Sequence, residues 1–240
     1  MSVKLEKQKI RERIWRLLEE RGVARFPRPI YGRIPNFRGA EEAAWKLVNH
    51  PIFRRARVVF SCPDSSQRPV REAVIRFRKT LVMASPRLRS GFLVIEPGIV
   101  PRGREREAST IRGAFKYGKQ DEVPDFKIDI KVTGSVAVTL DGARVGKGGG
   151  YSDLEYAILR EIGVLDENTP IITTVHELQI VDYIPMTRHD VPVDYIVTPK
   201  RIIETSHKYP KPPGIVLEEL DRRKIEEIPL LRKILENKRL

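Results

Sequence analysis

Residues 141–155 read DGARVGKGGGYSDLE, a glycine-rich loop that separates a β-rich run from a helical pattern. Ser152 and Glu155 have the spacing of a capping box, which predicts that the helix begins directly after the glycines. The free amides at that helix end and the positive end of the helix dipole would then act on the same spot. Glycines have no Cβ, so the backbone there can close around an anion. Lys147 adds a full positive charge, so the stretch predicts a phosphate-binding loop.

Two common phosphate-binding loops are excluded by the spacing. Tyr151 stands where the last glycine of a dinucleotide-binding fingerprint would fall, and the chain has no G-x-x-x-x-G-K-[ST] string. A flexible connection between a strand and a helix is the alternative interpretation of the same residues. Glycines lose much backbone entropy on ordering, so the four that lie between positions 146 and 150 are costly for a mere connection.

The rest of the chain alternates between short apolar runs typical of strands and amphipathic patterns typical of helices. This alternation predicts an α/β fold, with a mainly parallel sheet that carries helices on both faces. The expected strands are Arg57–Phe60, Leu81–Ala84, Leu93–Ile95, Ile128–Thr133, Val136–Leu140, Ile171–Val175 and Tyr195–Val197. The expected helices are Lys4–Arg21, Ala40–Asn49, Val70–Phe77, Glu105–Phe115, Asp153–Ile162 and one or two near the C-terminus, with Pro229 in a first turn.

No internal repeat and no Gly/Ser linker divides the chain, so we expect a single domain over residues 1–240. Gly22 is the expected end of the first helix. Residues 26–39 follow it as an extended arm rich in proline and arginine, because the prolines lack amide donors and fit neither a helix nor a central strand.

The composition favours anionic partners. The chain has 45 Lys and Arg residues against 32 Asp and Glu, a net charge of +13. It has no apolar run of membrane-spanning length. Its single cysteine, Cys62, cannot form an internal disulfide, and we find no signal peptide, so we expect a cytoplasmic protein.

Several strings together carry a family resemblance. The segment GSVAV at residues 134–138 and the loop at residues 142–153 resemble the signature of the 5-formyltetrahydrofolate cyclo-ligase (methenyltetrahydrofolate synthetase) family. Residues 7–11, KQKIR, resemble its first-helix string K-x-x-[LI]-R, and residues 189–194, HDVPVD, resemble its H-D-x-x-V-D string. Strings such as FPRP at residues 26–29 are most similar to the branch of methenyltetrahydrofolate synthetase domain-containing proteins.

The resemblance implies a fold and an activity. The fold is a three-layer α/β sandwich of the ribose-5-phosphate isomerase/CoA-transferase type. The activity is an ATP- and Mg²⁺-dependent ligase reaction, in which 5-formyltetrahydrofolate is phosphorylated on its formyl oxygen and closes to 5,10-methenyltetrahydrofolate. The implied partner is a small molecule, a reduced folate or a related heterocycle, and we expect a monomer or a homodimer.

The resemblance also implies the site residues. Those that bind the nucleotide are Lys7, Arg11, Arg144, Gly146, Lys147, Gly148, Gly149, Gly150, Tyr151 and Ser152. Lys147, Tyr151 and Arg11 have catalytic roles, and Asp153 and Asp190 hold the magnesium. Each assignment has a plainer alternative: Asp153 favours a helix N-terminus, Asp190 caps a turn, and Lys7 and Arg11 are solvated charges on one helix face.

Departures from the family pattern concern the substrate more than the nucleotide. The family's P-G-x-A-F-D string is GSVAVT at residues 134–139, and its Tyr-Tyr-Asp is YSD at residues 151–153. The rival interpretations are therefore a kinase of another small metabolite and a nucleotide-binding module with a basic RNA-binding surface made by Arg28, Arg33, Arg87 and Arg89. His176 follows a strand at the expected carboxyl edge, and a hydrogen-bonded loop histidine is its favoured interpretation.

Overall fold

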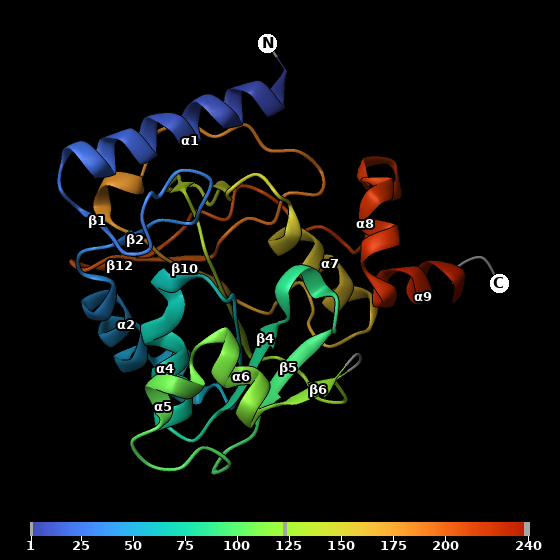
Figure 1. Cartoon of the computed structure of the whole chain (residues 1–240). Coiled ribbons are helices and arrows are strands. Elements are labelled where there is room, and N and C mark those ends of the chain that lie inside the picture. The colour runs from blue at the N-terminus through green and yellow to red at the C-terminus, as the bar shows by residue number, and fades with distance from the viewer. Residues whose placement is uncertain (1, 122–123, 238–240) are drawn as a thin grey trace.

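A computed structural model describes residues 2–121 and 124–237 of the chain. Its centre is an eight-stranded sheet in the order β12-β11-β10-β7-β3-β4-β5-β6 (Figure 1). Five neighbouring strands are parallel: β11 (Tyr195–Val197), β10 (Ile171–Thr174), β7 (Ile130–Thr133), β3 (Val58–Ser61) and β4 (Thr80–Ala84). The remaining strands, β5 (Phe92–Ile95) and the two edge strands β6 (Lys119–Asp121) and β12 (Ile202–Glu204), run antiparallel to their neighbours.

Both faces of the sheet are buried. Alternate residues of the central strands point to opposite sides and so enter different apolar clusters. In β3, Val59 joins one apolar cluster and Phe60 joins another. In β4, Leu81 and Val82 divide in the same way. The predicted three-layer α/β sandwich is therefore confirmed.

The helices form the outer layers (Figure 1). The first cluster is covered by α2 (Ala40–Asn49), α3 (Pro51–Arg55), α4 (Arg68–Arg76), α5 (Glu105–Ala108) and α6 (Ile111–Tyr117). The second cluster is covered by α7 (Tyr151–Glu161), α8 (Arg222–Glu227) and α9 (Pro229–Asn237). Short 3-10 turns η1 (Ser65–Gln67), η2 (Pro86–Leu88), η3 (Glu177–Gln179) and η4 (Leu217–Glu219) lie between these elements.

The first helix, α1 (Val3–Glu20), closes a third apolar cluster at one end of the sandwich. Two small hairpins belong to this part of the fold: β1 (Ala24–Arg25) with β2 (Asn36–Phe37), and β8 (Ala137–Val138) with β9 (Arg144–Val145). The arm between β1 and β2 is held against α1, since the Trp15 indole nitrogen donates to the Arg33 carbonyl over 3.0 Å. As predicted, the arm residues before β2 form neither helix nor strand.

Two predicted elements were wrong in detail. The helix expected over Glu105–Phe115 is two helices: the first ends at Ala108 with Ser109 as its C-cap, and Thr110 caps the second by accepting from Gly113 N at 3.0 Å. The strand expected over Val136–Leu140 leaves the main sheet and becomes β8. The strand expected over Leu93–Ile95 is present as β5, and it runs antiparallel to β4 because the connection through η2 is too short for a parallel crossover. None of the described helices has both the length and the apolarity needed to cross a membrane.

Candidate functional site

A pocket of about 580 Å³ lies where β3, β4 and β7 end and the glycine-rich loop begins. Ligands of α/β sheets bind at this carboxyl edge. The wall includes the loop and the start of α7, the segment after β3, the segment after β4 and part of the arm. Residues that represent these walls are Gly146, Lys147, Asp153, Asp64, Arg87 and Arg33.

Two other hollows have about 350 and 520 Å³. The first lies beside Asp129 and Tyr195, where β7 and β11 begin. The second lies beside Lys79 and Glu105, before β4 and at the start of α5. Both sit away from the carboxyl edge of the parallel strands, so the pocket beside the glycine loop is the candidate site.

The loop presents unpaired backbone donors. No backbone N–H from Gly146 to Gly150 donates a hydrogen bond to a residue within 2–121 or 124–237. Gly148 and Gly150 have φ of +105° and +64°, a region in which glycine is favoured. The predicted capping box is wrong: Gly150 is the N-cap of α7 without a side-chain hydrogen bond, and Ser152 lies inside the first turn. The amides of this helix end therefore stay available to an anion.

Two predicted cations lie at the loop. The Arg11 Nε donates to the Gly146 carbonyl over 2.7 Å, so the first helix packs against the loop as expected. The Lys147 ammonium contacts Asp64 across the pocket at 2.8 Å. Although partial burial opposes its charge, Asp64 raises the pKa of Lys147 above the ordinary value. Lys147 is therefore a fixed positive charge at neutral pH.

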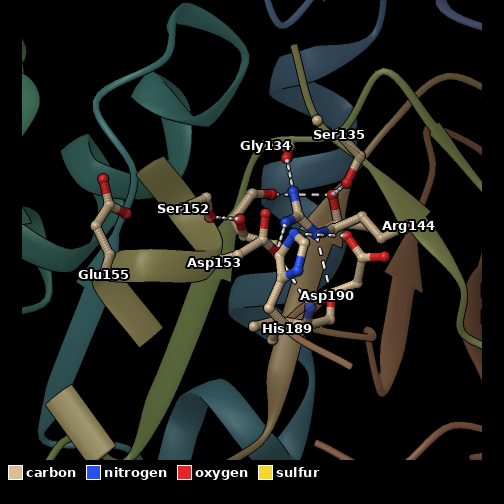
Figure 2. Close-up of polar contacts among 12 residues, drawn as sticks. Gly134, Ser135, Arg144, Ser152, Asp153, Glu155, His189 and Asp190 are labelled. Carbon is tan, nitrogen blue, oxygen red and sulfur yellow. Dashed lines mark hydrogen bonds and ion pairs between the residues drawn. The ribbon is translucent and has the colours of Figure 1, made fainter. Parts of the chain in front are cut away.

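Arg144 is buried beneath the loop and its donors are occupied. It donates to the carbonyls of Gly134 at 3.0 Å and Val191 at 3.2 Å, and forms an ion pair with Asp153 (Figure 2). Burial disfavours charge on both partners, but their mutual attraction raises the pKa of Arg144 and lowers that of Asp153. Asp153 also accepts from Val191 N at 3.1 Å. Arg144 thus holds the backbone around the pocket.

Lys7 and Asp190 form a buried ion pair. The Asp190 carboxylate also accepts from Thr187, from its backbone N at 2.5 Å and its hydroxyl at 2.8 Å. Neither Lys7 nor Asp190 lines the pocket, although Asp190 lies close to Arg144 (Figure 2). Of the two carboxylates predicted for magnesium, Asp153 alone faces the pocket. Within residues 2–121 and 124–237, no group of three or more His, Cys, Asp or Glu side chains could hold a metal ion.

Tyr151 and Ser152 both line the pocket but make different contacts. The Tyr151 hydroxyl donates to Glu227 of α8 at 2.9 Å. The Ser152 hydroxyl lies 2.6 Å from that of Thr133 at the end of β7. The first turn of α7 is therefore tied to the sheet on one side and to the C-terminal helices on the other.

Sequence reasoning missed a polar cluster at the floor of the pocket. Lys131 is 1% exposed and lies 3.6 Å from Glu155, with its ammonium 4.0 Å from the centre of the Phe60 ring. The Cys62 thiol is 3.5 Å from Glu155. Burial raises the pKa of both Glu155 and Cys62, and Lys131 opposes the rise in each case. The Cys62 thiol is therefore protonated at neutral pH.

Arg71 was also missed. This residue is 2% exposed, and its guanidinium donates to the carbonyls of Cys62 at 2.5 Å, Asp64 at 3.0 Å and Ser109 at 2.8 Å. These bonds fix the segment after β3 that presents Asp64 to Lys147. A buried arginine on an amphipathic helix has no distinctive sequence signal, whereas Asp64 follows a predicted strand at the carboxyl edge and could have been found.

His176 is a hydrogen-bonded loop residue that caps the 3-10 turn η3. Its Nδ1 accepts from Leu178 N at 3.2 Å, and Gln179 completes the capping box of η3. Burial lowers the pKa of His176, which keeps this ring neutral and able to accept the bond. The expected hydrogen-bonded loop histidine is confirmed.

Comparisons with known proteins support the architecture. The NMR structure of Aquifex aeolicus 5,10-methenyltetrahydrofolate synthetase is similar over 90% of this chain and 98% of that one, with a TM-score of 0.51 and 20% identity. Methenyltetrahydrofolate synthase domain-containing proteins of Mus musculus and Homo sapiens are each 40% identical to this chain and cover 98% and 97% of it. The matches take in 64% and 62% of those proteins, so this chain spans less than two thirds of the relatives' length.

The sequence model of the 5-formyltetrahydrofolate cyclo-ligase family matches residues 3–199, which include the first helix, the arm and the glycine loop. That range holds every residue predicted for the site, from Lys7 to Asp190. The chain therefore belongs to the 5-formyltetrahydrofolate cyclo-ligase family.

Proposed function

We propose that this protein is an ATP-dependent ligase that converts 5-formyltetrahydrofolate to 5,10-methenyltetrahydrofolate. One observation carries the proposal: the loop at residues 146–150, whose amides donate to no other described residue, lies in a pocket beside Lys147 and Arg11. The names of the relatives support the substrate, since an Escherichia coli 5-formyltetrahydrofolate cyclo-ligase is 28% identical over 89 residues. That match covers 37% of this chain and 46% of the relative.

Phosphoryl transfer requires mainly positioning and neutralisation of charge. In the proposed reaction the formyl oxygen attacks the γ-phosphorus of ATP, ADP leaves, N10 closes the ring and phosphate departs. The loop amides bind the phosphates, and Lys147 leaves Asp64 to contact the transferred group. Arg11 keeps the loop in place through the Gly146 carbonyl, and Tyr151 borders the reacting atoms from the start of α7.

We propose that Mg²⁺ enters with the nucleotide. Magnesium in phosphate sites is usually bound by one or two carboxylates together with phosphate oxygens, so it does not need a complete protein cage. Asp153 fits this role because its carboxylate lines the pocket beside the loop. Asp190 lies behind the pocket on Lys7, where its charge acts on Arg11. When bound, the metal supplies positive charge to the phosphates.

We also propose a cytoplasmic location. Cys62 is the only cysteine of the chain and is a free thiol. A chain without a disulfide suits the reducing cytoplasm, which is where reduced folates would also be protected from oxidation.

The direct test mixes the protein with 5-formyltetrahydrofolate and Mg-ATP and follows the absorbance of the methenyl product. Lys147→Met should lower the rate by at least about 100-fold, the usual cost of removing one group that stabilises the transition state. Lys208→Met is the matched control, because Lys208 contacts Asp141 at 3.1 Å outside the pocket. No product above background at high protein concentration would refute the proposal, as would equal rates for the two variants.

The RNA-binding alternative is less well supported by the geometry. Arg28 forms an ion pair with Glu19, and Arg33 and Arg87 line the pocket. Three of the four arginines assigned to that surface are thus engaged with α1 or with the site. A titration of RNA over a range of salt would still separate the two functions, since phosphate contacts predict a steep loss of affinity.

A further inference from the structure

Lys224 is a cation that reaches the glycine loop from α8, beyond the residues matched by the family model. Its Nζ lies 2.7 Å from the position that a Cβ on Gly150 would occupy, so the ammonium sits against the N-cap of α7. It also lies 5.1 Å from the centre of the Tyr151 ring. The side chain therefore ends at the same helix terminus as the unpaired loop amides.

The Lys224 ammonium contacts the aromatic ring of Tyr151 instead of a carboxylate. No carboxylate within residues 2–121 and 124–237 forms an ion pair with it, although Asp153, Asp221 and Glu227 act on it from a distance. Partial burial lowers the pKa of Lys224. A half-buried ammonium beside the positive end of a helix is an unfavourable arrangement in the absence of an anion.

The position of Lys224 is fixed by the fold. Glu227, one turn further along α8, accepts from the Tyr151 hydroxyl at 2.9 Å. Ile228 and Leu231 follow it and are fully buried in the cluster that also contains Leu154 of α7. The helices thus hold the ammonium at the loop against its own electrostatic cost.

Gly150 and Asp153 border both the main pocket and a small cavity of about 80 Å³ that Lys224 lines. The ammonium and the loop amides therefore approach the first turn of α7 from two sides. A negatively charged group seated on the amides would neutralise Lys224 as well as the helix end.

We propose that Lys224 is a phosphate ligand of this site and binds an oxygen of the polyphosphate that the loop amides hold. This rests on the proposed function and extends it, since it adds α8 to the nucleotide site. It also gives Gly150 a second role besides its positive φ, because any Cβ there would displace the ammonium.

Binding of Mg-ATP and of inorganic tripolyphosphate by calorimetry tests the assignment, with Lys224→Met as the variant. Arg223→Met is the matched control, because Arg223 precedes Lys224 on the same helix, is 84% exposed at its side chain and pairs with Asp221. Loss of a charged hydrogen bond predicts a Kd for both probes that is at least about tenfold higher in Lys224→Met. Arg223→Met should change it less than about twofold.

Thermal unfolding of the ligand-free protein separates a ligand from a structural residue. Because the Lys224 ammonium forms no ion pair with a described residue, its removal should leave the Tm of Lys224→Met unchanged or higher than that of the parent protein. A much lower Tm would make Lys224 a structural residue and overturn the inference.

The outcomes also distinguish this inference from the proposed function. If the parent protein binds both probes and Lys224→Met binds them equally well, the role of Lys224 is refuted and the proposed function stands. Tripolyphosphate binding that depends on Lys224, without methenyl product, would support the anion site and refute the proposed reaction. Binding of neither probe by the parent protein would refute both.

Discussion

The buried ion pair between Lys7 and Asp190 should make each residue expensive to replace alone and cheaper to replace together with its partner. The two side chains are 10% and 9% exposed, so neither charge is well solvated once its partner is gone. Asp190→Asn leaves an ammonium without a counter-charge, for which the expected loss of unfolding free energy is about 3–5 kcal/mol. Lys7→Met should cost less, because Asp190 keeps the two donors of Thr187.

The double variant Lys7→Met/Asp190→Asn removes both charges and should recover part of the loss. A coupling energy of about 2 kcal/mol is expected from residues in direct contact. Urea unfolding of the four proteins gives the coupling directly. A value below about 0.5 kcal/mol would refute the reasoning, since it would mean that the pair is effectively solvated.

The same variants test whether Asp190 holds the metal. Because Asp190 does not line the pocket, we expect the magnesium concentration for half-maximal rate to shift equally in Lys7→Met and Asp190→Asn. A larger shift in Asp190→Asn alone would place its carboxylate on the metal.

Three further predictions follow from single contacts. Because the pKa of Asp153 is lowered in the folded protein, its ionised carboxylate contributes stability that is complete above the ordinary pKa of about 3.9. This contribution is lost as the pH falls through the pKa of the folded state. Asp153→Asn should therefore make the unfolding free energy depend less on pH in the acid range. Gly148→Ala, at φ +105°, should lower the unfolding free energy by about 1–2 kcal/mol and raise the Kd for ATP. The control Gly98→Ala, at φ +87° with open space around it, should lose the same stability in urea unfolding but keep its affinity for ATP. Thr110→Ala removes the cap of α6 and should lower the unfolding free energy by about 1 kcal/mol, and a loss below about 0.3 kcal/mol would argue that the cap is solvated.

Sequence patterns predicted the parts of the fold that are buried on both faces. The predicted boundaries of β3 and β4 lie within one residue of the observed ones. Their apolar runs are recognisable because each strand contributes side chains to the clusters on both sides of the sheet. The edge strands β6 and β12 have three residues each and carry little pattern, so they were missed. The departure of β8 from the sheet depends on its pairing with β9, which periodicity does not encode.

At the site, the loop and its flanking helix were predictable because glycine spacing and charge are local features. The partners of the loop were less so. Asp64 approaches Lys147 from 83 positions away, and Lys224 approaches Gly150 from another helix near the C-terminus. Such contacts depend on how the layers pack, and the capping-box error at Ser152 has the same origin. Local spacing assigned the Ser152 hydroxyl to the helix cap, whereas in the structure it contacts the hydroxyl of Thr133 at the end of β7.

The two arginines predicted to bind the nucleotide have a different first task in the ligand-free protein. Arg11 occupies the carbonyl of Gly146 and Arg144 occupies that of Gly134, so the backbone on both sides of the pocket is fixed before any ligand arrives. Donors that are already oriented require no reorganisation when negative charge develops. Arg144 can be 3% exposed in a charged loop because Asp153 neutralises it. Direct contact with phosphate therefore falls to the amides, to Lys147 and, by our inference, to the lysine of α8.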